Sequence, residues 1–527
     1  MKDMKCKSII ISMLIVIGTL TSCKDVWDNH YSSSVSIKSD LSLYNYIKSQ
    51  PDLSIFTQML QITGYDSILN KAQTFTVWAP INSSLLTVNL LDTTLVTQIV
   101  KNHISRFSYP TSGIVSKTIY MIDQKFLVFK KTDAGYTFGG RSLVQSDIAT
   151  FNGILHTVDG YVPYAHNLWE FIGKTDGLDS LRNYLYAQNS YEFDVNASVE
   201  IGVNSKGQAI YDSIINFSNP ILTKIGRLYL EDSVYTAILP TNAAWTKVYN
   251  KIKLNYNTLA KDGGTTQQRL NTQWAIVQNL VFKNRIPDPS VFQTLTTTTG
   301  SVISHPDSLF LGSTKNELSN GLGYITDSLR FKASESWQKP IKVEAEVSKY
   351  GRTNSYSSLA IRSSLGSIYD VSDTKYLSCD PTTVSSTTQN SVTFPIPNTL
   401  SGKYRIYCVF VPTSMVLAND SKKNKVKFFF NHLDATGLKQ AIDTAVTVAN
   451  KLTNTAVSAG IFSTTPLLMT KMFVTEYTFP YCNLYDEKST PASIVNKLRV
   501  ENAVKITETV GFDRTFRIDY IILEPVQ

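Results

Sequence analysis

Histidine, cysteine and charged residues are scarce in this chain: its 527 residues include six histidines and five cysteines, and 17% are charged. The histidines show no metal-binding spacing and no Cys-x-x-Cys pair occurs, which argues against a zinc or dithiol redox site. The sequence also lacks a Gly-x-Ser-x-Gly motif, and Leu168 stands where a phosphate-binding loop around 173–175 would need glycine. These absences predict a protein that is not an enzyme, with unrecognised catalytic chemistry as the alternative.

A concentrated stripe of positive charge is also missing. The formal net charge is +8, and three lysines with Asp3 give the first 22 residues +2, which leaves +6 for the rest. Apart from KKNKVK at 422–427, the cations are scattered, so we expect a solvated lysine surface and no nucleic-acid partner. With 43% hydrophobic and 11% aromatic residues, the chain has ample material for buried cores.

The N-terminus has the features of an export signal. Lysines precede an apolar run from Ser8 to Leu20, which is too short to span a bilayer as a mature helix, and LTSC ends at Cys23. LTSC resembles the lipobox of bacterial lipoproteins, in which the cysteine is diacylated. We therefore predict a signal peptide at 1–22, lipidation of Cys23 and a tether at 23–37 that holds the protein to a membrane.

Three cysteines follow the tether, and their pairing is open from sequence. Cys379, Cys408 and Cys482 all lie in the last third of the chain. In an oxidising compartment they form either one disulfide with one thiol left over or three buried free thiols.

A sequence motif near residue 75 recurs near residue 235. FTVWAPINSSL at 75–85 returns as YTAILPTNAAW at 235–245, so that a strand, a proline and a capping asparagine coincide. Two further pairs follow in the same order: VKNHIS at 100–105 with VQNLVF at 277–282, and NGILHTVD at 152–159 with NGLGYITD at 320–327. Three landmarks repeated in order indicate a duplicated domain.

These blocks resemble the signature blocks of fasciclin-type (FAS1) domains. The resemblance covers 38–163 well and 168–332 in divergent form, with Leu280 in place of the central histidine. The second copy also carries a hairpin-like insertion, VEIGVNSKGQAIYDS, and a polar loop, KDGGTTQQR. The resemblance implies tandem β-wedge folds with a helical layer that serve adhesion or ligand display. His103 and His156 fall within these blocks, where we expect structural roles.

The predicted mature start, CKDVWDNHY, resembles the beginnings of Bacteroidota fasciclin lipoproteins. Many of those proteins are exported to the outer face of the outer membrane, and Lys24 and Asp25 provide a short form of their export signal. The resemblance implies an outer-membrane protein, lipid-anchored and facing the cell exterior.

Residues 335–527 differ from the preceding sequence in their pattern of apolar and polar residues. Short alternating strands separated by Ser/Thr/Asn turns predict a β-sandwich or jelly roll, with one flanking helix at 438–452. The whole chain is therefore predicted to be a multidomain α+β protein. The opening VEAEV and the closing RIDYIILEP resemble the galactose-binding-like jelly rolls of carbohydrate-binding modules.

The ends of this region carry acidic residues. Glu344 and Glu346 stand two apart on a predicted strand, and Asp519 lies in the apolar closing strand. If the first and last strands are neighbours, three carboxylates converge and suit a structural calcium ion, as in the resembled modules. The alternative is an acidic strand face in water.

Loop residues suggest a ligand site. Arg352 and Tyr356, with Tyr481 and Tyr485, are candidates for sugar binding, although loop tyrosines also pack against their own domain. The favoured function is a surface lipoprotein that binds glycan or another polymer beside an outer-membrane TonB-dependent transporter and its surface lipoprotein. The alternative is an adhesin for host matrix or neighbouring cells.

A short triplet suggests glycosylation. Asp followed by Ser or Thr and then a mostly aliphatic residue occurs eight times, where chance gives about two. The triplet resembles the O-glycosylation site of secreted Bacteroidota proteins. The predicted sites are Ser67, Thr93, Ser180, Ser213, Ser233, Ser308, Ser328 and Thr444. Alternatively, Asp-Ser pairs recur because they form turns and caps.

Overall fold

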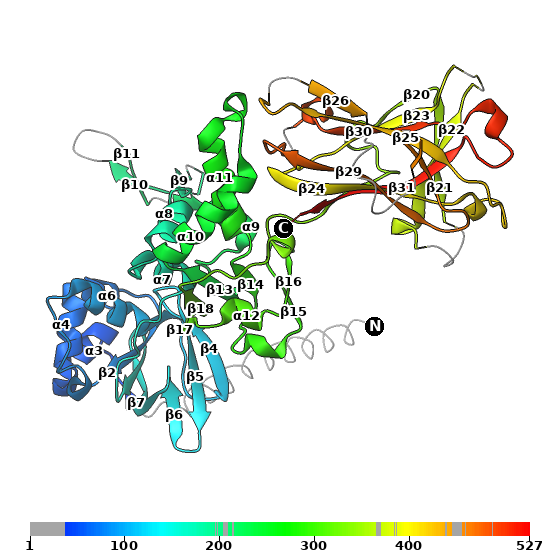
Figure 1. Ribbon diagram of the computed structural model, residues 1–527. Coiled ribbons are helices and arrows are strands. Elements are labelled where there is room, and N and C mark those ends of the chain that lie inside the picture. The colour runs from blue at the N-terminus through cyan, green and yellow to red at the C-terminus, as the bar shows by residue number, and fades with distance from the viewer. Residues whose placement is uncertain are drawn as a thin grey trace, which may run out of the picture. The chain divides into compact units, whose positions relative to one another are not determined.

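The computed structural model describes residues 37–526, apart from 195, 198, 204–208, 213–214, 365–369, 384, 386, 438–439, 445–455, 459 and 487–488. The chain divides into two compact units (Figure 1). The first comprises residues up to Phe171 with Leu228–Val234 and Glu317–Gly321, and the second comprises the remainder. Cys23, the signal peptide and almost all of the tether lie outside the described residues. Within the described part, no helix is long and apolar enough to cross a membrane.

The described part of the first unit is built on an eight-stranded sheet with helices α3 to α6. The sheet order is β3 (Ile104–Arg106), β2 (Phe75–Pro80), β8 (Gly153–Val158), β7 (Arg141–Thr150), β6 (Gly135–Phe138), β5 (Phe126–Thr132) and β4 (Ser116–Tyr120), while β1 (Ile37–Lys38) pairs with β7. The helices are α3 (Leu43–Ser49), α4 (Ser54–Ile62), α5 (Tyr65–Ile68) and α6 (Thr93–Asn102). All six residues of β2 are buried, which fits its place between β3 and β8.

The repeated sequence landmarks make matching hydrogen bonds. The Asn82 side chain accepts from Ile55 N (2.9 Å) at the start of α4, and Asn242 accepts from Ser180 N (2.8 Å) at the start of α8 (Asp179–Tyr186). Both asparagines therefore satisfy free N–H groups of a helix that lies earlier in the chain. This long-range contact explains why the residue recurs.

The asparagine of each Asn-Gly pair has a matching role too. Asn152 Nδ2 donates to the carbonyls of Leu69 (2.9 Å) and Lys71 (2.6 Å), and its Oδ1 accepts from Leu43 N (2.8 Å). In the second copy, Asn320 makes the same three bonds, to Leu228 O (2.8 Å), Leu230 O (2.9 Å) and Leu168 N (2.9 Å). The equivalence of these bonds supports duplication beyond the sequence pattern.

The second copy is organised around a four-stranded sheet. Its order is β14 (Val281–Lys283), β13 (Tyr235–Pro240), β18 (Gly321–Thr326) and β17 (Thr314–Leu318), and a short pair joins β15 (Thr294–Thr296) to β16 (Val302–Ser304). The helices are α7 (Leu168–Lys174), α8, α9 (Pro220–Ile225), α10 (Asn242–Ile252), α11 (Gly264–Val277) and α12 (Asp307–Phe310). The β13–β14 pairing places Thr236 opposite Phe282, as β2–β3 places Thr76 opposite Ser105.

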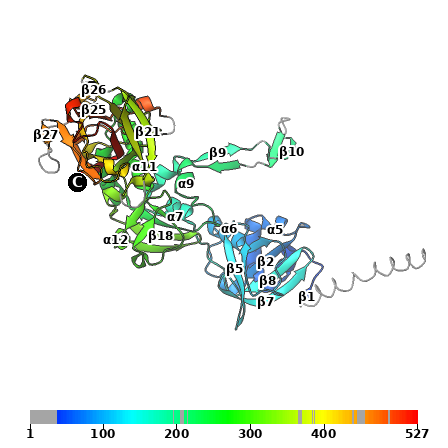
Figure 2. The ribbon, with the colours of Figure 1, turned by 90° about the vertical axis from the view of Figure 1, so that its right-hand side faces the viewer.

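The predicted hairpin insertion is confirmed as a ribbon. β9 (Ser190–Phe193) pairs with β12 (Ile215–Ser218), and β10 (Val199–Val203) pairs with β11 (Ala209–Asp212). Figure 2 shows this ribbon extending away from α9.

The C-terminal part of the second unit, here called the two-sheet region, contains no described α-helix. One sheet has the order β21 (Ser357–Ser363), β22 (Lys375–Pro381), β31 (Phe516–Pro525), β24 (Gly402–Phe410) and β29 (Thr470–Phe479), with β19 (Ile341–Glu344) also on β31. The other has the order β20 (Thr353–Ser355), β23 (Ser391–Pro395), β30 (Lys497–Asn502), β25 (Lys425–Leu433), β28 (Ile461–Ser463) and β27 (Ala456–Ser458), with β26 (Gln440–Thr444) also on β25. Aromatic pairs such as Phe410–Phe428 (6.3 Å between centroids) join the two sheets in a common core.

The predicted helix at 438–452 is wrong over 440–444, which forms strand β26, and its other residues lie outside the described part. Only Ile442 and Thr444 of this segment favour a strand, so pairing with β25 overrides its local preference.

Candidate functional site

The two histidines of the fasciclin-like blocks are buried and fully hydrogen-bonded. His103 Nδ1 contacts Trp78 O at 2.6 Å, and its Nε2 accepts from Val162 N at 2.8 Å. His156 Nε2 contacts Tyr109 O at 2.9 Å, and its Nδ1 accepts from Asp147 N at 3.3 Å. Burial lowers the pKa of each to about 4, so both are neutral near pH 7 and hold backbone segments together.

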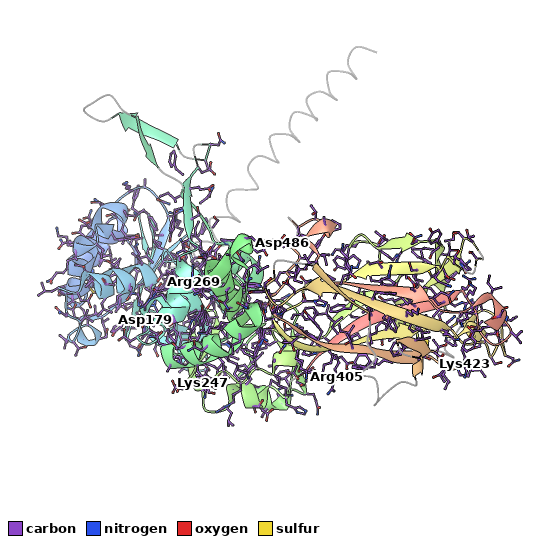
Figure 3. All side chains as sticks on the ribbon, turned by 45° about the horizontal axis from the view of Figure 1, so that its top comes forward. Asp179, Lys247, Arg269, Arg405, Lys423 and Asp486 are labelled. Atoms are coloured by element: carbon purple, nitrogen blue, oxygen red, sulfur yellow. The ribbon has the colours of Figure 1, made fainter. Side chains whose placement is uncertain are left out.

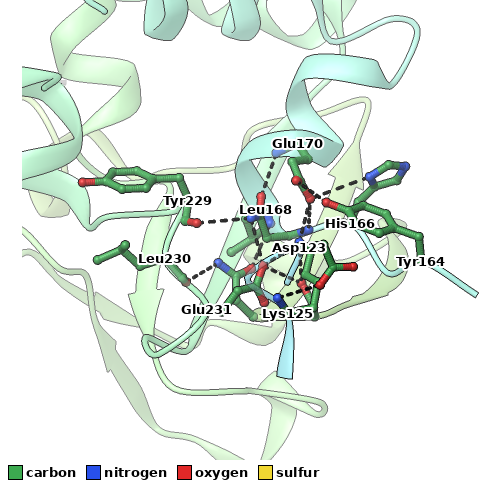
Figure 4. Close-up of polar contacts among 12 residues, drawn as sticks. Asp123, Lys125, Tyr164, His166, Leu168, Glu170, Tyr229, Leu230 and Glu231 are labelled. Atoms are coloured by element: carbon green, nitrogen blue, oxygen red, sulfur yellow. Dashed lines mark hydrogen bonds and ion pairs between the residues drawn. The ribbon is translucent and has the colours of Figure 1, made fainter. Parts of the chain in front are cut away.

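A buried lysine anchors a polar cluster in the first unit. Lys125, with 5% of its side chain exposed, contacts Glu170 at 2.7 Å and Glu231 at 2.5 Å (Figure 4). Tyr164 donates to the other Glu170 oxygen at 2.5 Å, and Lys125 Nζ lies 4.8 Å from the centre of its ring. Burial alone opposes ionisation of Glu170, but the Lys125 and Tyr164 hydrogen bonds outweigh it and lower its pKa. The cluster ties the β4–β5 turn to the segments around 164–170 and 231.

The structure brings two of the three predicted calcium ligands onto neighbouring strands. β19 pairs with β31, which meets the condition that the predicted site requires, and Glu344 lies opposite Tyr520. Strand β19 ends at Glu344, however, so Glu346 lies in the following turn and not two positions along a strand. The register of β24 with β31 skips Asp519, a bulge that leaves this carboxylate fully buried.

The carboxylates already have polar partners. Asp519 accepts from Ser372 N at 3.1 Å, and Glu344 contacts Lys342 Nζ at 2.7 Å and Ser372 Oγ at 2.8 Å. One oxygen each of Glu344 and Glu346 is buried without a hydrogen-bond partner. Within the part of the chain that the structure describes, no group of three His, Cys, Asp or Glu side chains is arranged to hold a metal ion. Oxygen donors suit calcium, so the ion stays a prediction that requires these side chains to move closer.

The buried carboxylate makes stability depend on pH. Burial, with repulsion from Glu344 and Glu346, raises the pKa of Asp519 to about 7, although Ser372 N–H opposes the rise. The folded state then binds this proton more tightly than the unfolded state, so its contribution is greatest below about pH 4 and is lost as pH rises through 7. In Asp519→Asn, we expect the fall in the free energy of unfolding between pH 4 and 8 to be smaller than in the wild type by about 2–4 kcal/mol. Denaturation of the full chain across this pH range measures the difference.

Calcium would reverse that pH dependence, because it favours the ionised carboxylate. At pH 8, added calcium should then raise the unfolding temperature of the wild type, and a chelator should lower it. Neither treatment should change the unfolding temperature of Asp519→Asn. No calcium shift at pH 8 would contradict a bound ion.

The three late cysteines are free thiols. Cys379 and Cys408 are buried and Cys482 is half-buried. Burial raises the pKa of all three, which makes their thiolates poor nucleophiles at neutral pH.

The four predicted sugar-binding residues do not form one site. Arg352 donates to Ala345 O, and Tyr356 is 54% exposed in the link between β20 and β21. Tyr485 packs edge-on against Tyr350, with ring centroids 5.4 Å apart. Tyr481 lines a cavity whose lining includes none of the other three.

That cavity, here called the α11 pocket, has a volume of about 600 Å³. One wall comes from η4 (Ala260–Asp262) and α11, and the other from the segment after β29; Figure 3 labels α11 at Arg269 and the segment at Asp486. All lining residues belong to the second unit. They are Thr258, Leu259, Lys261, Asp262, Gln267, Asn271, Leu433, Phe479, Pro480, Tyr481, Cys482, Asn483, Leu484, Asp486, Ser489, Ala492, Ser493, Val495 and Asn496.

One backbone and one side-chain hydrogen bond of Asn257 link the two walls. Cys482 N donates to Asn257 O at 2.8 Å, and Asn257 Nδ2 donates to Pro480 O at 2.9 Å. Gly437, with φ +70°, supports the Tyr481 wall, since a Cβ there would lie 2.5 Å from Leu259 and 2.6 Å from Tyr481. Sequence reasoning found Tyr481 but missed the α11 wall, whose only signal was the polar insertion KDGGTTQQR.

Aromatic residues on the outer face of the β24 sheet are covered by lysines. Lys471 Nζ lies 4.4 Å from the centre of the Tyr407 ring and 2.5 Å from Glu524. Lys342 Nζ lies 4.2 Å from the centre of the Tyr520 ring. This face therefore offers a sugar less open aromatic surface than its tyrosine content suggests.

The predicted glycosylation positions differ in exposure. Ser67, Thr93 and Ser308 are exposed, whereas Ser180, Ser233 and Ser328 are half-buried. Thr444 ends β26, and Ser213 lies outside the described residues. Four of the preceding aspartates lie at helix starts, where a carboxylate accepts hydrogen bonds from free N–H groups or interacts favourably with the helix dipole. They are Asp66 in α5, Asp92 before α6, Asp179 in α8 and Asp307 in α12. The recurrence of Asp-Ser/Thr at those places therefore has a capping explanation.

Comparison with known proteins identifies one domain. Residues 51–162 match the fasciclin domain family, within the predicted 38–163. None of the curated proteins matches this chain in sequence. Likeness to solved structures is remote, and it says nothing of ligand or activity.

Three solved structures show how remote the likeness is. A FAS1 domain pair from the insect cell adhesion molecule fasciclin I is 14% identical, with 54% of this chain and 98% of that chain covered and a TM-score of 0.20. The CBM22-1–GH10 modules of Clostridium thermocellum xylanase 10B are 13% identical, with 36% and 28% covered and a TM-score of 0.23. A non-crystalline cellulose specific carbohydrate-binding module, CBM28, is 12% identical, with 32% and 79% covered and a TM-score of 0.14.

Proposed function

We propose that this protein is a non-catalytic lipoprotein, anchored through Cys23 to the outer membrane and facing the cell exterior, that binds a glycan in the α11 pocket. On this proposal the chain carries two tandem FAS1 domains and a C-terminal jelly roll, and it serves a TonB-dependent nutrient-uptake complex as an accessory. O-glycosylation at the predicted serines and threonines and a structural calcium ion belong to the same proposal.

The α11 pocket is the observation that carries the proposal. Its volume lies within the range of about 300–1,000 Å³ that is usual for small-molecule sites. It combines an aromatic ring, Tyr481, with amide side chains such as Gln267 and Asn271, the groups that recognise sugar rings and hydroxyls. Buried neutral histidines and high-pKa thiols supply no evident catalytic group.

Loss of Tyr481 tests this function. We expect Tyr481→Ala to weaken oligosaccharide binding at least tenfold, because stacking surface in the pocket is removed. Calorimetric titration of the full chain with cello-, xylo-, manno- and maltotetraose measures the effect. Tyr356→Ala, which removes a 54% exposed tyrosine outside the pocket, is the matched control and should bind as the wild type does. Equal losses in both variants would argue against this site.

The anchor has its own test. We expect Cys23→Ser to release the protein from membranes into the soluble fraction, because diacylation needs the thiol. Fractionation of the native host, followed by protease treatment of intact cells, measures anchoring and exposure. A Cys23→Ser protein that still needs detergent for extraction would refute lipid anchoring.

Adhesion is the second candidate, and one surface favours it. On β4 and β5, Tyr120 and Phe126 are 51% and 42% exposed, with ring centroids 5.1 Å apart. An exposed aromatic pair of this kind suits a protein contact. A gene for a TonB-dependent transporter beside this one would favour uptake, and its absence would favour adhesion.

A further inference from the structure

The helical wall of the α11 pocket contains two side-chain amides, and each has one polar atom available for a further hydrogen bond. Gln267 and Asn271 stand four residues apart on α11 and therefore share one face of the helix. Gln267 Nε2 donates to Asn271 Oδ1 at 2.8 Å. This bond fixes both amide planes and leaves Gln267 Oε1 as an acceptor and Asn271 Nδ2 as a donor. Among the described residues, neither of these two atoms has a recorded hydrogen-bond partner, and both side chains line the cavity.

The opposite wall uses its amides internally. Asn483 Oδ1 accepts from Val495 N at 3.0 Å, and its Nδ2 donates to Ser493 O at 3.1 Å. Asn496 Nδ2 donates to Thr399 Oγ1 at 2.8 Å. What this wall offers a ligand is chiefly the surface of Pro480, Tyr481 and Leu484.

We propose that Gln267 and Asn271 determine the specificity of the α11 pocket by binding two adjacent hydroxyl groups of an uncharged oligosaccharide, while the Tyr481 wall contacts the sugar ring. This inference rests on the proposed function, because it names the ligand class and the specificity residues of the same site. It also makes the polar insertion KDGGTTQQR, which continues into the first turns of α11, part of the binding site.

The chemistry of the amide pair selects this ligand class. A hydroxyl both donates and accepts, so one hydroxyl donates to Gln267 Oε1 while its neighbour accepts from Asn271 Nδ2. A fully ionised phosphate or sulfate lacks a donor for the first atom. The lining also carries two carboxylates, Asp262 and Asp486, against one cation, Lys261, and this net negative charge opposes an anion. An apolar ligand would leave both amide atoms without partners on desolvation.

Single and double substitutions of the pair test the inference. In titrations of the full chain with cello-, xylo-, manno- and maltotetraose, we expect Gln267→Ala and Asn271→Ala each to weaken binding of the best ligand about tenfold. Gln273→Ala is the matched control, since Gln273 lies on α11 outside the lining and contacts Arg269 at 3.1 Å. It should bind as the wild type does, and far-ultraviolet circular dichroism should show that all variants fold.

A modified ligand separates hydroxyl recognition from loss of shape. The best tetraose with its vicinal hydroxyls O-methylated should bind the wild type about tenfold or more weakly, yet should bind the double variant Gln267→Ala/Asn271→Ala no worse than the unmodified sugar. If the tetraose binds and needs Tyr481 but not this pair, the inference is wrong and the proposed function stands. If none of the four sugars binds the wild type, both are wrong.

Discussion

Replacing Lys125 with methionine is expected to lower the free energy of unfolding of the first unit by about 3–5 kcal/mol. The variant keeps the apolar stem but leaves Glu170 and the 7% exposed Glu231 without their cation. Two neighbouring carboxylates in a poorly hydrated site then repel each other without a cation between them, which destabilises the folded state. Urea denaturation followed by hydrogen exchange of β2 and β8 peptides measures the change.

Two further variants test the cause of that loss. Lys130→Met removes an exposed lysine of β5 and should change stability by no more than about 0.5 kcal/mol. The triple variant Lys125→Met/Glu170→Gln/Glu231→Gln should recover most of the lost stability, because the uncompensated charges are gone. If Lys125→Met behaves like Lys130→Met, the cluster does not stabilise the fold.

The second large effect is expected at Asn152. Asn152→Ala removes three hydrogen bonds and leaves the Leu69 and Lys71 carbonyls and the Leu43 N–H without their partner. At about 1–3 kcal/mol for each backbone group left unsatisfied in a buried site, we expect a loss of about 3–4 kcal/mol, since water reaches part of the site. Thermal denaturation and hydrogen exchange at the start of α3 measure it.

The duplicated residue supplies the comparison. Asn320→Ala breaks the matching bonds to Leu228, Leu230 and Leu168, so a loss of similar size should be localised to the start of α7. Asn152→Asp keeps the acceptor for Leu43 N but places a carboxylate against two carbonyls, and it should be no more stable than Asn152→Ala. A neutral Asn152→Ala would refute this role.

Several features could be predicted from the sequence because they depend on local pattern. An apolar strand ending in proline, an Asn-Gly pair and their recurrence gave the first fasciclin domain and the matching landmarks of the second copy. The pattern of short alternating strands predicted the sheet-rich C-terminal part, whereas the pairing of its opening and closing strands is seen in the structure. Side-chain periodicity and turn residues carry this information without long-range contacts.

Other expectations failed where pairing or irregular backbone intervened. Glu346 lies beyond the end of β19, because the point at which a strand ends depends on its partner strand and not only on the local alternation of residues. Asp519 does lie in the closing strand, but the bulge beside it could not be predicted from the local pattern. Residues 440–444 form strand β26 because they pair with β25. The helix prediction used local sequence alone and could not include this partner strand. Tyr356 and Tyr481 are both loop tyrosines in the sequence, yet Tyr481 lines the α11 pocket and Tyr356 does not.

By itself the sequence determined the fasciclin domain at 51–162, the repeated landmarks and the strand-rich end, since each depends on residues that lie close together along the chain. The tertiary structure alone decided the rest. It paired Lys125 with glutamates 45 and 106 residues away, and it placed Gln267 and Asn271 across a cavity from Tyr481. Such sites form where distant segments meet, and their energies depend on burial and distance, which no local pattern encodes.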